Sequence, residues 1–271
     1  DGGAKDIFCL CPQCRAWDPR TDRLRTWRIF LGRTRPVFQY PGLTDRMLRF
    51  TSEVARGVQQ AAPDLKIMYL AYSSYQAPPL YYRDVPDNLA VSFVGLQYFH
   101  DDALDRDRDA WDFWAGISPE MRLRPNLLLD GHGMPAVYVR KLARDLRHCR
   151  QTGMMAADFD SLMHHWATQG LNYYVLARML WNPSLDAEDI VQDYCRHGFG
   201  PAAQAVRQYF ALCEQVTDRL AAGQASEVAE LEDLSNTQLS LLDKLPFYYT
   251  PDVLAAMAAA GYAYAIVGGA G

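Results

Sequence analysis

The chain has 271 residues, of which 49% are hydrophobic, and its formal net charge is −5 at pH 7. Acidic and basic residues are interspersed, with no basic block that would follow a phosphate backbone, so nucleic-acid binding is not expected. No apolar run approaches the roughly 20 residues that a membrane-spanning helix needs. Six cysteines are too few, in a chain of this length, to indicate a disulfide scaffold.

Helical and β-favouring patterns alternate over the first two thirds of the chain. Helices are expected over residues 44–62, in the charged segment that ends before Pro119, and from Val139 to Cys149. Four strands are expected, and in chain order they cover residues 66–75, 89–99, 124–133 and 154–158. These strands are almost continuously apolar and no hairpin-sized turn joins them, which is typical of a parallel sheet buried on both faces. The fold class is therefore α/β, with either an open doubly wound sheet or a closed (β/α) barrel.

From Thr168 onward the pattern is purely helical. Asp186 is a good N-cap for a helix that Gly198 closes, and Pro201 suits the first position of the next helix. Two more helices are expected, over residues 226–244 and after Thr250-Pro251. We therefore divide the chain into an α/β part over residues 1–183 and an α-helical subdomain over residues 184–271.

Polar or aromatic side chains follow each expected strand. They are Tyr72 and Tyr75; Tyr98, His100 and Asp101; Asp130 and His132; and Asp158 and Asp160. Because the carboxyl ends of parallel strands meet at one end of a sheet, we expect these side chains to share a crevice. Carboxylates that accept hydroxyl hydrogen bonds, together with the indole faces of Trp111, Trp114 and Trp166, suit a sugar ligand.

Each of these residues also has a purely structural interpretation. Asp130 precedes a glycine and could form a turn, and Asp158 or Asp160 could cap the helix that follows. His132 could be an exposed loop residue. Trp111 and Trp114 lie at helical spacing, which is more typical of a core than of a sugar platform. The combined pattern predicts a site and leaves its reaction open.

A second chemical pattern is "CLCPQC", which contains Cys9, Cys11 and Cys14. The C-x-C-x-x-C spacing resembles a metal knuckle, but tetrahedral zinc takes four ligands and a second C-x-x-C is missing. Packed thiols are favoured, with a disulfide inside the cluster and a structural metal as the alternatives. No P-loop, dinucleotide-binding or nucleophile-elbow motif occurs, so no cofactor and no catalytic metal are predicted.

Several segments resemble the bacterial family of the domain of unknown function 4838. They are "DGG…FCLCPQCRAWD", "RFTSEVARGV", "KIMYLAYSSYQAPP" and "LNYYVLARMLWNPSLDAEDIVQDY…GFGPAA", in order over residues 1 to about 215. The resemblance implies a (β/α)8 glycoside-hydrolase-like barrel, in a family that includes endo-β-N-acetylglucosaminidases and is similar in plan to hexosaminidases and α-glucuronidases. It also implies a secreted or periplasmic location.

The resemblance bears on the site in two places. Its "DGG" segment continues a barrel strand end, so Asp1 becomes a candidate substrate-binding residue and the chain is expected to be a fragment that lacks the N-terminal half of the barrel. Relatives often have a glutamate where this chain has Asp158, whose carboxylate lies about 1 Å further back, a displacement that is large for catalysis.

The leading hypothesis is a glycosidase that cleaves a β-linked N-acetylhexosamine, with Asp158 and Asp130 as the catalytic candidates. The residues expected to bind the oligosaccharide are Asp1, Tyr72, Tyr75, Tyr98, His100, His132, Asp160 and Trp166. The main alternative is a carbohydrate-binding protein derived from such a barrel that does not catalyse. An unrelated α/β enzyme or a structural α/β domain is the third interpretation.

Overall fold

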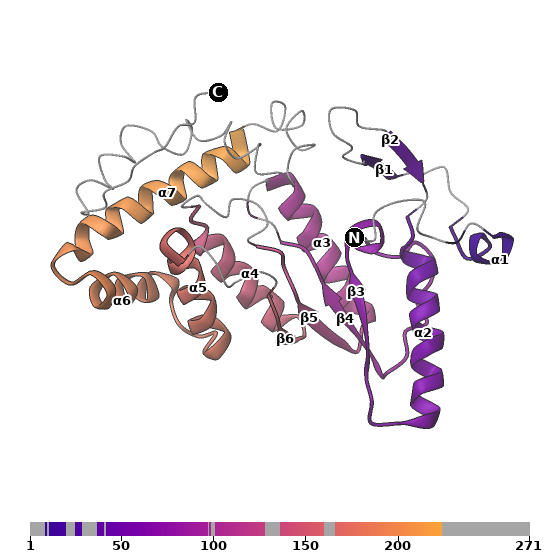
Figure 1. Ribbon diagram of the computed structural model, residues 1–271. Coiled ribbons are helices and arrows are strands. Elements are labelled where there is room, and N and C mark those ends of the chain that lie inside the picture. The colour runs from indigo at the N-terminus through magenta and orange to yellow at the C-terminus, as the bar shows by residue number, and fades with distance from the viewer. Residues whose placement is uncertain are drawn as a thin grey trace. The chain divides into compact units, whose positions relative to one another are not determined.

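The computed structural model describes residues 9, 11–19, 25–28, 37–40, 42–96, 98, 101–127, 136–159 and 166–223 (Figure 1). These residues form two compact units. The first unit contains the described residues up to 96 together with 102–127 and 148–159. The second contains residues 98, 101, 136–147 and 166–223.

The first unit is built on a four-stranded sheet with the order β3-β4-β5-β6, in which all neighbours are parallel (Figure 1). The strands are β3 (Ile67–Ala71), β4 (Leu89–Phe93), β5 (Glu120–Leu123) and β6 (Met154–Ala157). Strands that are consecutive in the sequence are also neighbours in the sheet. Because every pair is parallel, all four carboxyl ends lie at the same end of the sheet. The expected α/β class with a parallel sheet is confirmed.

The third strand lies upstream of its predicted position. The sequence predicted a strand over 124–133, whereas β5 ends at Leu123 and residues 124–127 lie outside any strand. In β5 the buried Met121 alternates with charged neighbours, and Glu120 accepts hydrogen bonds from Lys66 and Arg122. Ion pairing allows charged residues in this strand, so a search for continuous apolar runs missed it.

Helix α3 (Asp101–Ile117) supplies the aromatic core that packs on the sheet. Trp111 and Trp114 are both fully buried. The Trp111 ring meets Phe93 of β4 edge to face at 5.9 Å, and its Nε1 donates to Thr152 Oγ1 at 2.8 Å. Trp114 Nε1 donates to a backbone carbonyl at 2.8 Å. Both tryptophans are therefore core residues, and the interpretation of them as sugar platforms is wrong.

The crossover from β3 to β4 contains no α-helix. Residues 72–88 form this crossover, which consists of a 3-10 turn, η2 (Ser73–Tyr75), and the expected proline-rich loop. A loop of this length must find partners for its backbone N–H groups outside regular structure. Asp45, in the first turn of α2 (Thr44–Ala61), accepts from the N–H groups of residues 80–82 at 2.7–2.8 Å. The start of α2 thus anchors the crossover.

Three short elements precede α2 and were not predicted. They are the helix α1 (Pro12–Arg15) and two antiparallel strands, β1 (Arg25–Arg28) and β2 (Val37–Tyr40). Elements of four residues carry too little periodicity to be recognised in a sequence.

Helices form the second unit, as the sequence predicted from Thr168 onward. They are α5 (Trp166–Trp181), α6 (Ala187–Phe199) and α7 (Ala203–Gly223), together with the start of α4 (Val139–Gln151); η3 (Gly200–Ala202) joins α6 to α7. Asp186 is the N-cap of α6, as predicted, whereas the helix continues past Gly198 to Phe199 and its C-cap is Gly200, with φ 51°. No helix in the described part of the chain has the length and apolar character needed to cross a membrane.

Two predictions about the C-terminal part are not tested. The helices expected over 226–244 and after residue 250 lie outside the described residues. The boundary at residue 183 also stays a prediction, and the second unit includes described residues on both sides of it.

We expect an Asp186→Ala variant to lose about 1 kcal/mol of unfolding free energy, because the Asp186 carboxylate accepts the Glu188 N–H at 2.8 Å. Urea denaturation would measure the loss. Asp189→Ala, an exposed position in the same first turn, removes the same charge without removing the cap and is the matched control. Equal losses in the two variants would show that charge, rather than capping, accounts for the effect.

Candidate functional site

The residues that follow β4, β5 and β6 form one row at the carboxyl end of the sheet in the first unit. The N–H groups of Val94, Arg124 and Asp158 donate across the sheet to the carbonyls at the ends of β3, β4 and β5, respectively, at 2.8–3.0 Å. Tyr72 follows β3 at the same end. The backbone ladder therefore continues past the strands and fixes where these side chains begin.

An ion pair lies at the β5–β6 side of this row. Arg124 Nε donates to Asp158 Oδ2 at 2.8 Å, joining the residues that follow two adjacent strands. The Asp158 side chain is 58% exposed and the Arg124 side chain 29% exposed. The pair therefore presents a fixed carboxylate to solvent, with a guanidinium beside it that balances its charge.

Sequence reasoning found Asp158 and missed Arg124. The third strand was expected to begin at residue 124, which would have made Arg124 part of the sheet. Its signal was available in the sequence: a charged residue directly after the alternating segment 120–123.

The loops after β3 and β4 are held in uncommon backbone conformations. Ser73 and Leu96 are the described non-glycine residues with positive φ, at 52° and 68°. Asp107 of α3 supports both loops, because it accepts from the Leu96 N–H at 2.7 Å and from Gln76 Nε2 at 3.0 Å. Strained conformations of this kind cost roughly 1 kcal/mol or more each and tend to occur at functional sites.

Two tyrosines of the predicted site also belong to this end of the sheet. Tyr72 and Tyr75 are half-buried, and the backbone carbonyl of Tyr75 accepts a hydrogen bond from the Tyr69 hydroxyl at 2.8 Å. Tyr72 and Asp158 follow the two outer strands, three strand spacings apart, or roughly 14 Å across the sheet. The structure thus brings Tyr72, Tyr75 and Asp158 to one end of the sheet without placing them in contact.

The other predicted residues belong to the second unit or lie outside the described residues. Tyr98 belongs to the second unit, is 2% exposed, and stacks on Tyr138 with the ring centroids 4.8 Å apart. Trp166, the first residue of α5, is 59% exposed, and its ring centroid lies 5.7 Å from that of Tyr173. Asp101, the first residue of α3, pairs with Lys141 at 2.7 Å. The other candidates lie outside the described residues: Asp1, His100, Asp130, His132 and Asp160.

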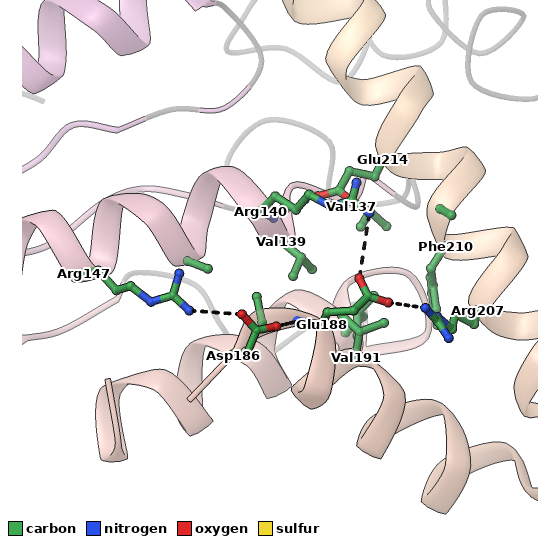
Figure 2. Close-up of a pocket in the computed structure, with 14 residues that line it drawn as sticks. Val137, Val139, Arg140, Arg147, Asp186, Glu188, Val191, Arg207, Phe210 and Glu214 are labelled. Atoms are coloured by element: carbon green, nitrogen blue, oxygen red, sulfur yellow. Dashed lines mark hydrogen bonds and ion pairs between the residues drawn. The ribbon is translucent and has the colours of Figure 1, made fainter. Parts of the chain in front are cut away.

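The second unit contains a cavity of about 380 Å³ among α4, α5, α6 and α7. Figure 2 shows Glu188 between two arginines: Arg207 lies 2.6 Å from one of its carboxylate oxygens and Arg140 lies 3.9 Å from the other. Arg140 also pairs with Glu214 at 2.7 Å, and Arg147 with Asp186 at 4.0 Å. The three arginines and three carboxylates balance one another in charge, and their ion pairs join residues of α4, α6 and α7. Sequence reasoning had no signal for it.

Glu214 is the buried member of that network. Burial raises the pKa of its carboxyl above the ordinary value, against the opposing effect of the Arg140 backbone N–H. Between the ordinary and the raised pKa, the folded state holds the proton more tightly than the unfolded state does. The contribution of Glu214 to the unfolding free energy therefore falls as the pH rises through this window.

We expect this pH dependence to be absent in a Glu214→Gln variant. Relative to that variant, wild type should lose unfolding free energy as the pH rises from the ordinary carboxyl pKa toward the raised pKa of Glu214. Urea denaturation at several pH values would measure the difference. Glu188→Gln, an exposed member of the same network, is the control. A wild type that gains stability over Glu214→Gln as the pH rises would contradict the expectation.

The comparisons with known proteins place the chain in a family. No curated protein and no solved structure matches it. The model of a family described as "Domain of unknown function (DUF4838)" matches residues 4–211, a range that contains the whole parallel sheet and the Asp158–Arg124 pair. The chain belongs to the DUF4838 family.

Proposed function

We propose that this protein is glycoside-hydrolase-like and acts on a glycan, with a β-linked N-acetylhexosamine at the cleaved bond. The observation that carries the proposal is the exposed Asp158–Arg124 pair at the carboxyl ends of adjacent parallel strands. Active sites of α/β sheets and barrels lie at this end, because the side chains after the strands converge there. A secreted or periplasmic location is part of the same proposal.

The chemistry proposed for Asp158 is substrate-assisted. In a 2-acetamido sugar the amide oxygen can attack the anomeric carbon as the bond to the leaving oxygen breaks, and the leaving oxygen takes a proton from water. A second water then attacks the anomeric carbon, which reopens the ring and regenerates the acetamide. An Asp158 carboxylate that accepts the amide N–H would orient this nucleophile and balance the positive charge that develops on the ring formed. Arg124 favours this role, because its Nε donates to Asp158 Oδ2 at 2.8 Å and holds that oxygen in one direction. Asp130 is the candidate for a sugar hydroxyl or the amide.

The aromatic residues fit a glycan longer than one ring. Tyr72 and Tyr75 lie at the far side of the sheet end from Asp158, roughly three strand spacings away. Phenol hydroxyls there could bind a second sugar. Trp166 belongs to the second unit and stays a predicted substrate-binding residue.

We also propose that the parallel sheet is part of a (β/α)8 barrel. Among the described strands, β3 and β6 each have one paired side. Leu65, Met68 and Met155 lie on or beside these outer strands and are more than half exposed. Further parallel strands would pair both sides and cover these apolar side chains.

A carbohydrate-binding protein without catalysis is the second candidate. The resemblance to the family implies a glutamate at the position of Asp158, and the shorter aspartate would hold its carboxylate about 1 Å further from a substrate, which is unfavourable for catalysis. A binding protein would retain saturable glycan binding in Asp158→Asn and would form no product.

Turnover of chromogenic N-acetyl-β-glucosaminides and of N-glycopeptides, followed by mass spectrometry of the released sugars, tests the proposal. Product release that requires Asp158 supports hydrolysis. Saturable binding of the same glycopeptides without release, in a protein with native circular dichroism, would favour the second candidate. Neither binding nor release would reject both.

A further inference from the structure

Three cysteines near the start of the described chain have their sulfur atoms close together. The Sγ atoms of Cys9, Cys11 and Cys14 all lie within 4.8 Å of one another. A tetrahedral zinc site with bonds of about 2.3 Å places its sulfur atoms roughly 3.8 Å apart. Small side-chain rotations would therefore bring all three sulfurs onto one ion. A disulfide would use only two of them.

These thiols differ from the other cysteines of the chain in their exposure. Cys149, Cys195 and Cys213 are buried at 1–3% exposure and behave as packed apolar groups. Cys9 is exposed, and Cys11 and Cys14 are partly exposed. The sequence favoured packed thiols at these three positions. Their exposure means that burial of apolar surface does not explain the cluster.

The turn that carries the cluster is held in place. The Cys14 N–H donates to Cys11 Sγ at 3.4 Å, which closes the C-x-x-C turn and directs a hydrogen bond at one sulfur. The buried side chain of Arg46 in α2 donates to the Cys9 carbonyl at 2.8 Å and pairs with Asp18 just beyond the cluster. One arginine of the first unit thus fixes both flanks of the segment, which reduces the ordering that a metal ion would have to impose.

We propose that Cys9, Cys11 and Cys14 bind one zinc ion through their thiolates, with water in the fourth position. Thiolates are the ligands that zinc and other soft ions prefer, and each thiol gives its proton to solvent when it binds. The site is separate from the Asp158–Arg124 pair and does not depend on the proposed sugar chemistry.

The test uses the whole chain, reduced and freed of metal under anaerobic conditions. Wild type should take up one equivalent of zinc. Cobalt in its place should give the thiolate charge-transfer band and the visible spectrum of a tetrahedral ion. Cys9→Ser, Cys11→Ser and Cys14→Ser should each weaken zinc binding by about 100-fold or more, because a serine hydroxyl keeps its proton at neutral pH. Gln13→Ala, an exposed change inside the same turn, should bind as wild type does.

Two results would overturn the proposal. One is reduced wild type, folded by circular dichroism, that leaves cobalt with the spectrum of the aquated ion. The other is an unchanged zinc affinity in all three serine variants, which would mean that the ion binds at a different site from the three cysteines. Circular dichroism of every variant separates lost ligands from lost fold.

Discussion

An Asp158→Asn variant is expected to lose about 1000-fold in kcat/KM toward an N-acetylglucosaminide or N-glycopeptide that the wild type cleaves, with its fold retained. A positioned carboxylate contributes about 100- to 10,000-fold to reactions of this kind, and the asparagine amide keeps the shape of the side chain without its charge. The change corresponds to about 4 kcal/mol of transition-state stabilisation. Because the Asp158 side chain is mostly exposed, the substitution should leave the unfolding free energy nearly unchanged.

Substitutions of Arg124 test whether the direction of the Asp158 carboxylate matters for turnover. Arg124→Ala removes the partner at 2.8 Å, and we expect it to lower kcat by about 10-fold or more, since the carboxylate loses its fixed direction. Arg124→Lys should recover part of that loss, because it restores the charge without the planar guanidinium.

Asp64→Asn is the matched control for Asp158→Asn. Asp64 is an exposed aspartate in the turn before β3, at the amino end of the sheet. Its substitution should leave turnover unchanged. If Asp158→Asn and Asp64→Asn turn over substrate at equal rates, Asp158 has no catalytic role. The strongest catalytic candidate at the carboxyl end of the sheet would then be rejected.

Much of the fold follows from patterns in the sequence that are local and long. The 44–62 periodicity predicted α2 to within one residue of its end, and Asp186 was correctly predicted as a cap. β4, with every residue buried, has the continuous apolar composition expected of a central parallel strand. These predictions succeed because the apolar pattern of a strand or helix, and the residue that caps a helix, can be read from residues that are close in sequence.

The failures have a common physical origin in partners that are distant in sequence. Glu120 and Arg122 can lie in a strand because Lys66 is beside them, and the ion pair of Arg124 with Asp158 joins residues 34 apart. Trp111 and Trp114 have the residue type of a sugar platform, and only their packing on the sheet makes them core residues. A sequence identifies groups capable of chemistry, whereas their three-dimensional neighbours decide which of them face solvent.

An Asp45→Ala variant is expected to lose about 3 kcal/mol of unfolding free energy, the largest effect on stability that we predict. The Asp45 carboxylate is 5% exposed and accepts three backbone N–H groups of the β3–β4 crossover. An unsatisfied buried donor costs about 1–3 kcal/mol, and the full sum is not reached because Leu80 and Tyr81 are exposed enough for water to reach part of the loop. Asp45→Asn, which keeps one acceptor oxygen, should lose about half as much.

Urea denaturation would measure these losses, and hydrogen exchange of the amides of residues 80–82 would locate them. Asp84→Ala is the control, because it removes the same charge from an 80%-exposed side chain whose ion pair with Arg56 contributes at most about 0.5 kcal/mol. A loss below about 1 kcal/mol in Asp45→Ala, or unchanged exchange at residues 80–82, would mean that the crossover keeps its shape without α2. The expected result would instead make the first turn of α2 the support for Tyr72 and Tyr75, because the same crossover carries both tyrosines to the end of the sheet where Asp158 lies.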